Sequence, residues 1–311
     1  MIACVFPGQG AQKVGMGQDL AAQFPVCRET LDEADAVLGE PLSRLCFEGP
    51  DDALVLTENA QPAILAVSVA IHRLAAGRGL RASFAAGHSL GEYSAHVAAG
   101  TLSFADALRT VRRRGRYMQE AVPPGHGAMA AVLGLDARRV HEVCVEAAAD
   151  GGVVTPANLN APGQVVIAGD AAAVARAGAL AKARGAKRVI PLAVSAPFHS
   201  PLMKPAEERL APDLRALNAR DPSFPVVANV DAEPKRDAAS AVDALIRQVS
   251  APVRWEDVVK RLVAEGVRTF VELGPGTVLA GLIRKIDPSV TTVSIDTSAG
   301  LEKASAVWGG A

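Results

Sequence analysis

Short apolar runs alternate with amphipathic stretches along the first part of the chain. The apolar run IACVF stops at Pro7 and a glycine turn, which is typical of a buried strand that leads into a loop. The amphipathic stretch that begins at Ser103, a good helix cap, is stopped by Pro123 and Pro124. By the same signals, strands are expected at residues 2–6 and 83–86, and helices at residues 17–39, 60–76 and 103–121.

A different order of elements is expected between Gly127 and Leu192. Strand patterns occupy residues 128–135, 153–159, 164–169 and 187–192, and helical patterns occupy residues 136–149 and 171–184. The resulting order, βαββαβ, is the ferredoxin-like arrangement. We therefore predict a small ferredoxin-like domain at residues 126–194, inserted into a large catalytic domain made of residues 1–125 and 195–311.

After the insertion, helices and strands alternate again. Helices are expected at residues 203–217, 239–249 and 255–265, and strands at residues 225–230 and 269–273. Such alternation gives a mostly parallel sheet with helices on both faces. The predicted fold class is α/β, with a large domain on a mostly parallel sheet and a small inserted domain.

The composition excludes several kinds of partner. With 32 Lys and Arg against 33 Asp and Glu, the net charge of -1 gives no overall field to attract nucleic acid or an anionic membrane. The chain has no secretory start and no run of about 18 uninterrupted apolar residues. Its four cysteines are scattered, without the spacing of metal ligands or of a secreted disulfide framework. We expect a soluble, cytoplasmic protein with reduced thiols and no bound metal.

A candidate nucleophile lies where the second predicted strand meets a helix. The segment GHSLG at residues 87–91 matches the G-x-S-x-G nucleophile elbow, whose glycines allow the tight turn that lifts the serine hydroxyl above the sheet. A plain glycine turn before a helix would give the same five letters. The strand and helix on either side of Ser89 favour the catalytic interpretation.

A serine nucleophile needs a base, and the chain has six histidines. His199 stands in the loop VSAPFHSPL, directly after a predicted strand, where catalytic bases are often placed. The alternative is a solvated loop histidine. The remaining histidines are expected to be structural, because they lie inside helical patterns, beside the serine itself, or among prolines and glycines: His72, His88, His96, His126 and His141.

The helix expected from residue 103 to 121 carries five arginines. At about 100° per residue, Arg114 lies with Val111 and Met118 on the apolar side. The other four are expected at the surface: Arg109, Arg112, Arg113 and Arg116. Because a buried guanidinium is unfavourable without an anionic partner, Arg114 needs a carboxylate. That carboxylate belongs either to an Asp or Glu of the chain or to a substrate.

Five motifs, in the same order as in a known family, span nearly the whole chain. They are FPGQGAQ at 6–12, GHSLGEYSA at 87–95, RGRYMQEAVP at 114–123, APFHS at 196–200 and ELGPGTVLAGL at 272–282. With these motifs the chain resembles malonyl-CoA:acyl carrier protein transacylases and the related acyltransferase domains of polyketide synthases. The resemblance implies a hydrolase-like large domain with an inserted ferredoxin-like domain. It also implies ping-pong transfer of a malonyl group through an ester on Ser89.

The resemblance implies roles for several residues in the chemistry. Ser89 would be the nucleophile and His199 its base, in a dyad whose histidine is oriented by the backbone carbonyl of Gln248 rather than by a carboxylate. The backbone N–H groups of Gln9 and Leu90 would form an oxyanion hole. FPGQGAQ is not a phosphate loop, because it lacks the G-x-x-x-x-G-K-[ST] pattern, so no nucleotide cofactor is expected.

The resemblance also implies the substrates. Arg114 would bind the free carboxylate of malonyl-CoA, and Leu90 and Phe198 resemble the residues of malonyl-selective members rather than methylmalonyl-selective ones. The acceptor would be acyl carrier protein, with no cofactor and no metal. Service in fatty-acid or in polyketide synthesis stays open.

Some alternatives also stay open. Asp170, after the run QVVIAG, is the best-placed acid if a carboxylate orients the histidine. Asn158 and Asn160 either shape the site or are structural. The basic stretch from Lys182 to Arg188 is either a docking surface for an acidic carrier or a solvated helix end. The rival functions are a thioesterase or esterase, which admits water to the acyl-enzyme, and a catalytically idle docking module.

Overall fold

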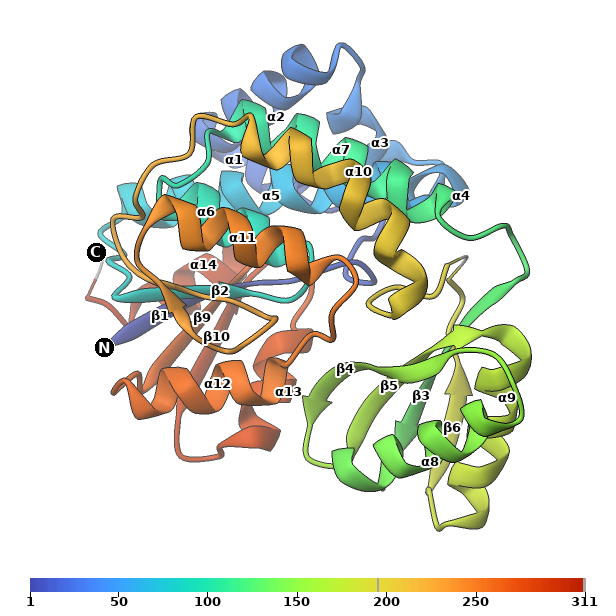
Figure 1. Ribbon diagram of the computed structural model, residues 1–311. Helices are drawn as coiled ribbons and strands as arrows, with labels where there is room; N and C mark the ends of the chain where they lie inside the picture. The colour runs from blue at the N-terminus through green and yellow to red at the C-terminus, as the bar shows by residue number, and fades with distance from the viewer. Residues whose placement is uncertain (195, 310–311) are drawn as a thin grey trace.

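The computed structural model describes residues 1–194 and 196–309, and this part of the chain contains two β-sheets (Figure 1). The larger sheet has the strand order β10-β9-β1-β2-β7-β8. Its strands are β1 (Ile2–Phe6), β2 (Phe84–Gly87), β7 (Val226–Val227), β8 (Pro234–Lys235), β9 (Thr269–Leu273) and β10 (Thr291–Ile295). Neighbouring strands pair in parallel, except that β8 is antiparallel to β7. The predicted α/β class with a mostly parallel sheet is confirmed.

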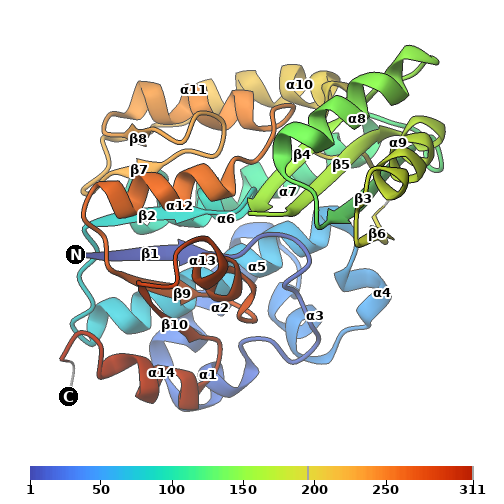
Figure 2. The same cartoon turned by 90° about the horizontal axis from the view of Figure 1, so that it is seen from below.

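Helices cover both faces of this sheet (Figures 1 and 2). They are α1 (Gln18–Gln23), α2 (Pro25–Leu38), α3 (Leu42–Glu48), α4 (Asp51–Leu54), α5 (Thr57–Gly77), α6 (Gly91–Ala98), α7 (Phe104–Glu120), the short 3-10 helix η1 (Pro201–Met203), α10 (Lys204–Arg215), α11 (Ala238–Gln248), α12 (Trp255–Ala264), α13 (Val278–Ile286) and α14 (Ser298–Ser305). The side chains of alternate residues in β1 point to opposite faces of the sheet. Cys4 and Phe6 join a core with α2, α5 and α7, whereas Ala3 and Val5 pack with α12 and α13.

Helix α5 runs through the middle of the larger core. By length and composition it is the one described helix that could cross a membrane, but 78% of its apolar stretch is buried inside the protein. It packs against α2 and α7, and residues such as Ile64 and Leu65 have no exposed surface. Its apolar character is therefore that of a core helix.

The smaller sheet is antiparallel and carries two helices on one side (Figures 1 and 2). Its strand order is β4-β5-β3-β6, made of β3 (Gly127–Leu133), β4 (Val154–Ala161), β5 (Gln164–Asp170) and β6 (Arg188–Pro191), with α8 (Ala137–Ala149) and α9 (Ala171–Ala183). The chain order βαββαβ is the one that the pattern predicted, and the unit has a hydrophobic core of its own. The exact bounds proposed for the domains, 1–125 with 195–311 and 126–194, remain a prediction.

The small unit is tied to the large one along one edge. Strand β4 forms a parallel bridge at Asn158 with Val253, and backbone hydrogen bonds join Val253 to Ala157 and Leu159. Val253 lies two residues before α12, which packs on the large sheet. The two sheets therefore meet near the carboxyl end of β2, where the serine motif lies.

Several local expectations were wrong. The single helix expected at residues 17–39 is two helices, because Pro25 lacks the N–H that would continue α1 and instead begins α2. The strand expected at residues 225–230 is paired only at Val226–Val227, since the chain turns back through Ala232 at a φ of 57°. Arg112 was expected at the surface, but its side chain is only 15% exposed and contacts Asn59 and Glu40.

Candidate active site

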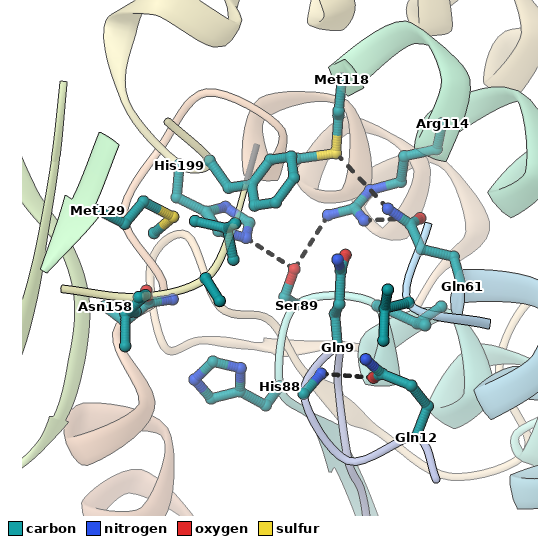
Figure 3. A pocket seen from close by; sticks show the side chains of 17 residues that line it. Gln9, Gln12, Gln61, His88, Ser89, Arg114, Met118, Met129, Asn158 and His199 are labelled. Atoms are coloured by element: carbon teal, nitrogen blue, oxygen red, sulfur yellow. Dashed lines mark hydrogen bonds between the residues drawn. The ribbon is translucent and has the colours of Figure 1, made fainter. Parts of the chain in front are cut away.

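A cavity of about 410 Å³ opens between the two units, and Ser89 lies in it (Figure 3). Residues of the loop after β1, the turn after β2, α5 and α7 line one side, and residues of β3, β4 and the segment before η1 line the other. The cavity therefore sits at the carboxyl ends of β1 and β2, the usual position of active sites on open parallel sheets.

The turn that carries Ser89 is sterically demanding. Strand β2 ends at Gly87, α6 begins at Gly91, and Ser89 between them has a φ of 51°, in the left-handed region that non-glycine residues seldom occupy. A Cβ atom on Gly91 would lie 2.0 Å from the carbonyl oxygen of Phe6, and one on Gly87 would lie 1.9 Å from the carbonyl carbon of Gly91. The two glycines thus let the helix approach the sheet closely enough to form the elbow that the motif predicted.

His199 lies directly beside the serine. Its Nε2 is 2.7 Å from Ser89 Oγ, and its Nδ1 is 3.0 Å from the carbonyl oxygen of Gln248. Because a carbonyl only accepts hydrogen bonds, Nδ1 carries the proton and Nε2 is left to accept the serine proton. Burial and, to a smaller extent, the nearby positive charge of Arg114 lower the pKa of His199 to about 3. The imidazole is therefore neutral at neutral pH, as a base must be.

No carboxylate orients His199 in the described part of the chain. Asp170, the acid weighed as an alternative, instead accepts a hydrogen bond of 2.5 Å from the N–H of Val153, which directly precedes β4. The Nδ1 position of the imidazole is already taken by the Gln248 carbonyl. The arrangement is a serine-histidine pair supported by a backbone dipole.

Arg114 reaches the serine from the opposite side (Figure 3). It is 1% exposed, and its Nη2 donates to Ser89 Oγ at 3.1 Å and to Oε1 of Gln248 at 2.9 Å, while Nη1 donates to Oε1 of Gln61 at 2.9 Å. No Asp or Glu among the described residues lies within ion-pair distance of it. Amide oxygens thus bind the two terminal nitrogens of the guanidinium without neutralising it, and the buried Nε has no hydrogen-bond partner in the described part of the chain.

Burial lowers the pKa of Arg114, although the nearby Tyr93 and Glu92 oppose this effect. The guanidinium remains a cation, because an arginine side chain keeps its proton even when it is buried. A fully buried, charged guanidinium whose partners are neutral amides, facing a cavity, is a site for an anion from outside the chain.

The other predicted site residues also line the cavity. Gln9, Leu90 and Phe198 do so, together with Asn158. The backbone N–H groups of the two residues beside Leu90 form hydrogen bonds within the protein. That of Ser89 donates to Oδ1 of Asn229, and that of Gly91 donates to the carbonyl oxygen of His88. The N–H groups of Leu90 and Gln9 enter no hydrogen bond with the rest of the described chain, so they are available to a substrate oxygen.

His88, which was expected to be structural, lies at the site. It lines the cavity, its Nε2 is 2.8 Å from Oδ1 of Asn160, and its ring contacts that of Trp255. The same hydrogen bond gives Asn160 a place beside the site. Periodicity has no meaning in a three-residue turn, and for that reason the direction of the His88 side chain could not be predicted from the sequence.

Three residues near the serine were missed: Gln61, Glu92 and Asn229. Glu92 is fully buried, its Oε2 accepts hydrogen bonds from the N–H of Asn229 and from Nε2 of Gln248, and burial raises its pKa to about 7. The one available signal was polarity in an apolar context, because Gln61 stands within the apolar run of α5 and Glu92 within that of α6. Asn229 lies in an irregular segment and gave no such signal.

These groups together suit acyl transfer through a serine ester. A hydroxyl contacts a neutral imidazole, two unused N–H groups lie at the elbow and the first loop, and a buried cation faces the same cavity. The geometry defines a serine enzyme that handles an acyl group bearing a negative charge.

Comparison with known proteins agrees with this class. The family model described as "Acyl transferase domain" matches residues 3–305. The chain is 50% identical over 303 residues to the malonyl CoA-acyl carrier protein transacylase of Bacillus subtilis. The aligned region covers 97% of this chain and 96% of that protein. This chain therefore belongs to the acyl transferase family, as the sequence motifs predicted.

Solved structures of relatives have the same fold. The acyl-carrier-protein S-malonyltransferase of Burkholderia pseudomallei is 49% identical, with a TM-score of 0.95 over 97% of this chain and 98% of that one. A malonyl-transacylase solved in complex with its type II PKS acyl-carrier protein is 48% identical, with a TM-score of 0.95 over 97% of this chain and 98% of that one. The predicted hydrolase-like fold with a second, smaller unit is that of these enzymes.

Proposed function

We propose that this protein transfers a malonyl group from malonyl-CoA to the phosphopantetheine thiol of acyl carrier protein, through a malonyl ester on Ser89. The observation that carries the proposal is that Ser89 Oγ contacts both a neutral imidazole, at 2.7 Å, and a buried guanidinium, at 3.1 Å. The first group activates the hydroxyl, and the second binds an acyl group that ends in a carboxylate. The malonyl and carrier protein in the names of the relatives support both substrates.

In the first half-reaction, Ser89 Oγ attacks the thioester carbonyl of malonyl-CoA while His199 Nε2 takes the hydroxyl proton. The negative charge that develops on the carbonyl oxygen is stabilised by the N–H groups of Gln9 and Leu90, and removal of one such donor typically costs about 100- to 1000-fold in rate. The carbon–sulfur bond then breaks, and the imidazolium returns its proton to the sulfur of CoA. The malonyl ester remains on Ser89.

In the second half-reaction the same groups act in reverse. The thiol of the carrier protein gives its proton to His199 Nε2 and attacks the ester carbonyl, and Ser89 regains the proton as it leaves. The Gln248 carbonyl holds the imidazolium in place during both steps, because it accepts a hydrogen bond from the Nδ1–H group of His199. No metal or cofactor takes part in this scheme.

Arg114 selects the acyl group. We assign it to the malonyl carboxylate, which would replace the amide oxygens of Gln61 and Gln248 as its partner. Pairing would also neutralise the charge that lowers the pKa of His199, so the substrate itself would make the base stronger. Leu90 and Phe198 are assigned to packing around the acyl group, since both line the cavity.

We also propose a cytoplasmic setting for the reaction. All four cysteines are free and buried, which suits the reducing cytoplasm. For the carrier surface, Lys182, Lys187 and Arg188 are exposed, whereas Arg184 contacts Glu146. Contact between an acidic carrier and these cations remains a prediction of the sequence.

The test is transfer itself. Purified protein is mixed with malonyl-CoA, passed through a desalting column and then given the holo form of acyl carrier protein, with the masses of both proteins measured at each stage. A malonyl adduct that forms on the enzyme and then moves to the carrier supports the proposal. Release of free malonate without transfer would instead favour a thioesterase. If no malonyl adduct forms on the enzyme, the result would favour a docking module without catalytic activity.

A further inference from the structure

Asn229 is buried beneath the serine elbow, outside the residues that line the cavity. It follows β7 in the segment PVVANV and has no exposed surface. Its Oδ1 accepts the N–H of Ser89 at 2.7 Å, and its Nδ2 donates to the carbonyl oxygen of Gly87 at 2.7 Å. One carboxamide thus binds the backbone at the nucleophile and at Gly87, two residues before it.

The orientation of this carboxamide is determined by its partners. A rotated amide would place its NH₂ group against the N–H of Ser89 and its oxygen against the carbonyl of Gly87, so that both hydrogen bonds would be lost. The backbone of Asn229 is fixed too. Its N–H donates to Oε2 of Glu92 at 2.9 Å, and its carbonyl accepts the N–H of Arg254 at 3.1 Å. The side chain is therefore held rigidly while it binds the elbow.

The elbow needs such support because Ser89 has a φ of 51°, a conformation that costs of the order of 1–3 kcal/mol for a non-glycine residue and persists only where the surroundings impose it. A buried N–H also requires an acceptor. Asn229 supplies that acceptor for Ser89, and in doing so it leaves the next N–H, that of Leu90, without a partner in the described chain.

We propose that Asn229 is a positioning residue for the nucleophile: its carboxamide locks the Gly87–Ser89 backbone so that the serine hydroxyl meets His199 and the Leu90 N–H stays free for the oxyanion. This inference rests on the proposed acyl transfer at Ser89. Since Asn229 does not touch the cavity, its loss slows acylation while leaving the binding of malonyl-CoA nearly unchanged.

Two variants test the two hydrogen bonds. Asn229→Ala removes both. Asn229→Asp keeps the acceptor for Ser89 but sets a carboxylate oxygen against the Gly87 carbonyl, and protonation of the introduced carboxyl restores a donor there. The charged groups around it are Glu92, Asp231 in the same segment, and Arg114 beyond Gln248. Burial of the site raises the pKa of the introduced carboxyl, and Glu92, whose own pKa is raised to about 7, raises it further when ionised. The matched control is Asn218→Asp, the same change at an exposed residue.

The readouts are the rate of malonyl-enzyme formation in a single turnover and the KM for malonyl-CoA, at about pH 8 and about pH 6, with circular dichroism to monitor folding. We expect acylation about 10- to 100-fold slower than in the unmodified protein for both variants, with KM changed by less than about threefold. The acylation rate of Asn229→Asp, divided by that of the unmodified protein, should rise at the lower pH. The same ratio for Asn229→Ala should not rise.

Folded variants that acylate at the rate of the unmodified protein, or a pH response shared by both variants, would overturn the inference. Loss of the folded state in both variants would also overturn it, because Asn229 would then support the fold rather than the nucleophile. If the unmodified protein itself forms no malonyl adduct, the failure is that of the proposed function.

Discussion

Removing the charge of Arg114 should change the choice of acyl group more than the chemistry itself. In Arg114→Ala, a malonyl carboxylate would enter a desolvated cavity and find no cation, whereas an acetyl group has no carboxylate to leave unpaired. Truncation of one partner of a buried charge pair typically costs about 2–5 kcal/mol. At about 1.4 kcal/mol per tenfold, kcat/KM for malonyl-CoA should fall roughly 30- to several-thousand-fold.

The contacts of Arg114 also predict a smaller loss common to both substrates. Its removal leaves the Oε1 atoms of Gln61 and Gln248 without their donor and takes one hydrogen bond from Ser89 Oγ. Arg114→Lys keeps the charge, but a single ammonium cannot occupy the fork between the two amides. We therefore expect Arg114→Lys to retain part of the preference for malonyl-CoA that Arg114→Ala loses.

The assay compares kcat/KM for malonyl-CoA and acetyl-CoA in each variant, with thermal melting to measure stability. Arg109→Ala, on the exposed side of the same helix, is the matched control and should behave as the unmodified protein. Equal losses for the two substrates, accompanied by a lower melting temperature, would refute the carboxylate-binding role and would assign Arg114 to the structure of the site.

Two further predictions concern stability. Gly91→Ala should lower the free energy of unfolding by about 3 kcal/mol or more in urea titrations, because its Cβ would lie 2.0 Å from the Phe6 carbonyl oxygen. Gly77→Ala, with no atom within 4 Å of its Cβ, should leave the free energy of unfolding nearly unchanged. Similar losses in the two variants would contradict the close approach of α6 to β1 as the reason for a glycine at position 91. His96 is fully buried without a hydrogen bond, and burial lowers its pKa from 6.5 to about 3, so the unfolded chain binds a proton below pH 6.5 that the folded protein does not. The free energy of unfolding therefore falls as the pH decreases from about 6.5 toward 3, by up to about 1.4 kcal/mol per pH unit for this group. His96→Leu should reduce this pH dependence in urea titrations at several pH values. An unchanged pH dependence would show that His96 is protonated in the folded state.

Local pattern was enough to predict the elements that position the nucleophile. The elbow at Ser89 depends on glycines at fixed spacing, and the βαββαβ unit depends on apolar periodicity, both of which are properties of neighbouring residues. The buried side of Arg114 followed from the same helical periodicity. Ser89 and His199 were candidates from the elbow and from the loop after a strand, and the role of Gln248 came from the family resemblance; the distances among these residues are consistent with all three roles.

What surrounds those residues could not be predicted, because it depends on contacts between distant segments. The partners of Arg114 come from α5 and from the end of α11, and the support of the elbow comes from Asn229, 140 residues beyond Ser89. The sequence could say that Arg114 needed a partner but not that two glutamines would serve. For the same reason the sequence could not show that His88 contacts Asn160, since Asn160 belongs to the other sheet.

The most direct test of the account is the mass of the protein after a brief reaction with malonyl-CoA. The unmodified protein should gain one malonyl group, Ser89→Ala should gain none, and His199→Ala should gain it far more slowly, because a neutral serine hydroxyl is a poor nucleophile without a base. Ser103→Ala, at an exposed helix cap, should react like the unmodified protein. A malonyl adduct on Ser89→Ala, formed at the normal rate, would place the nucleophile elsewhere and contradict the mechanism.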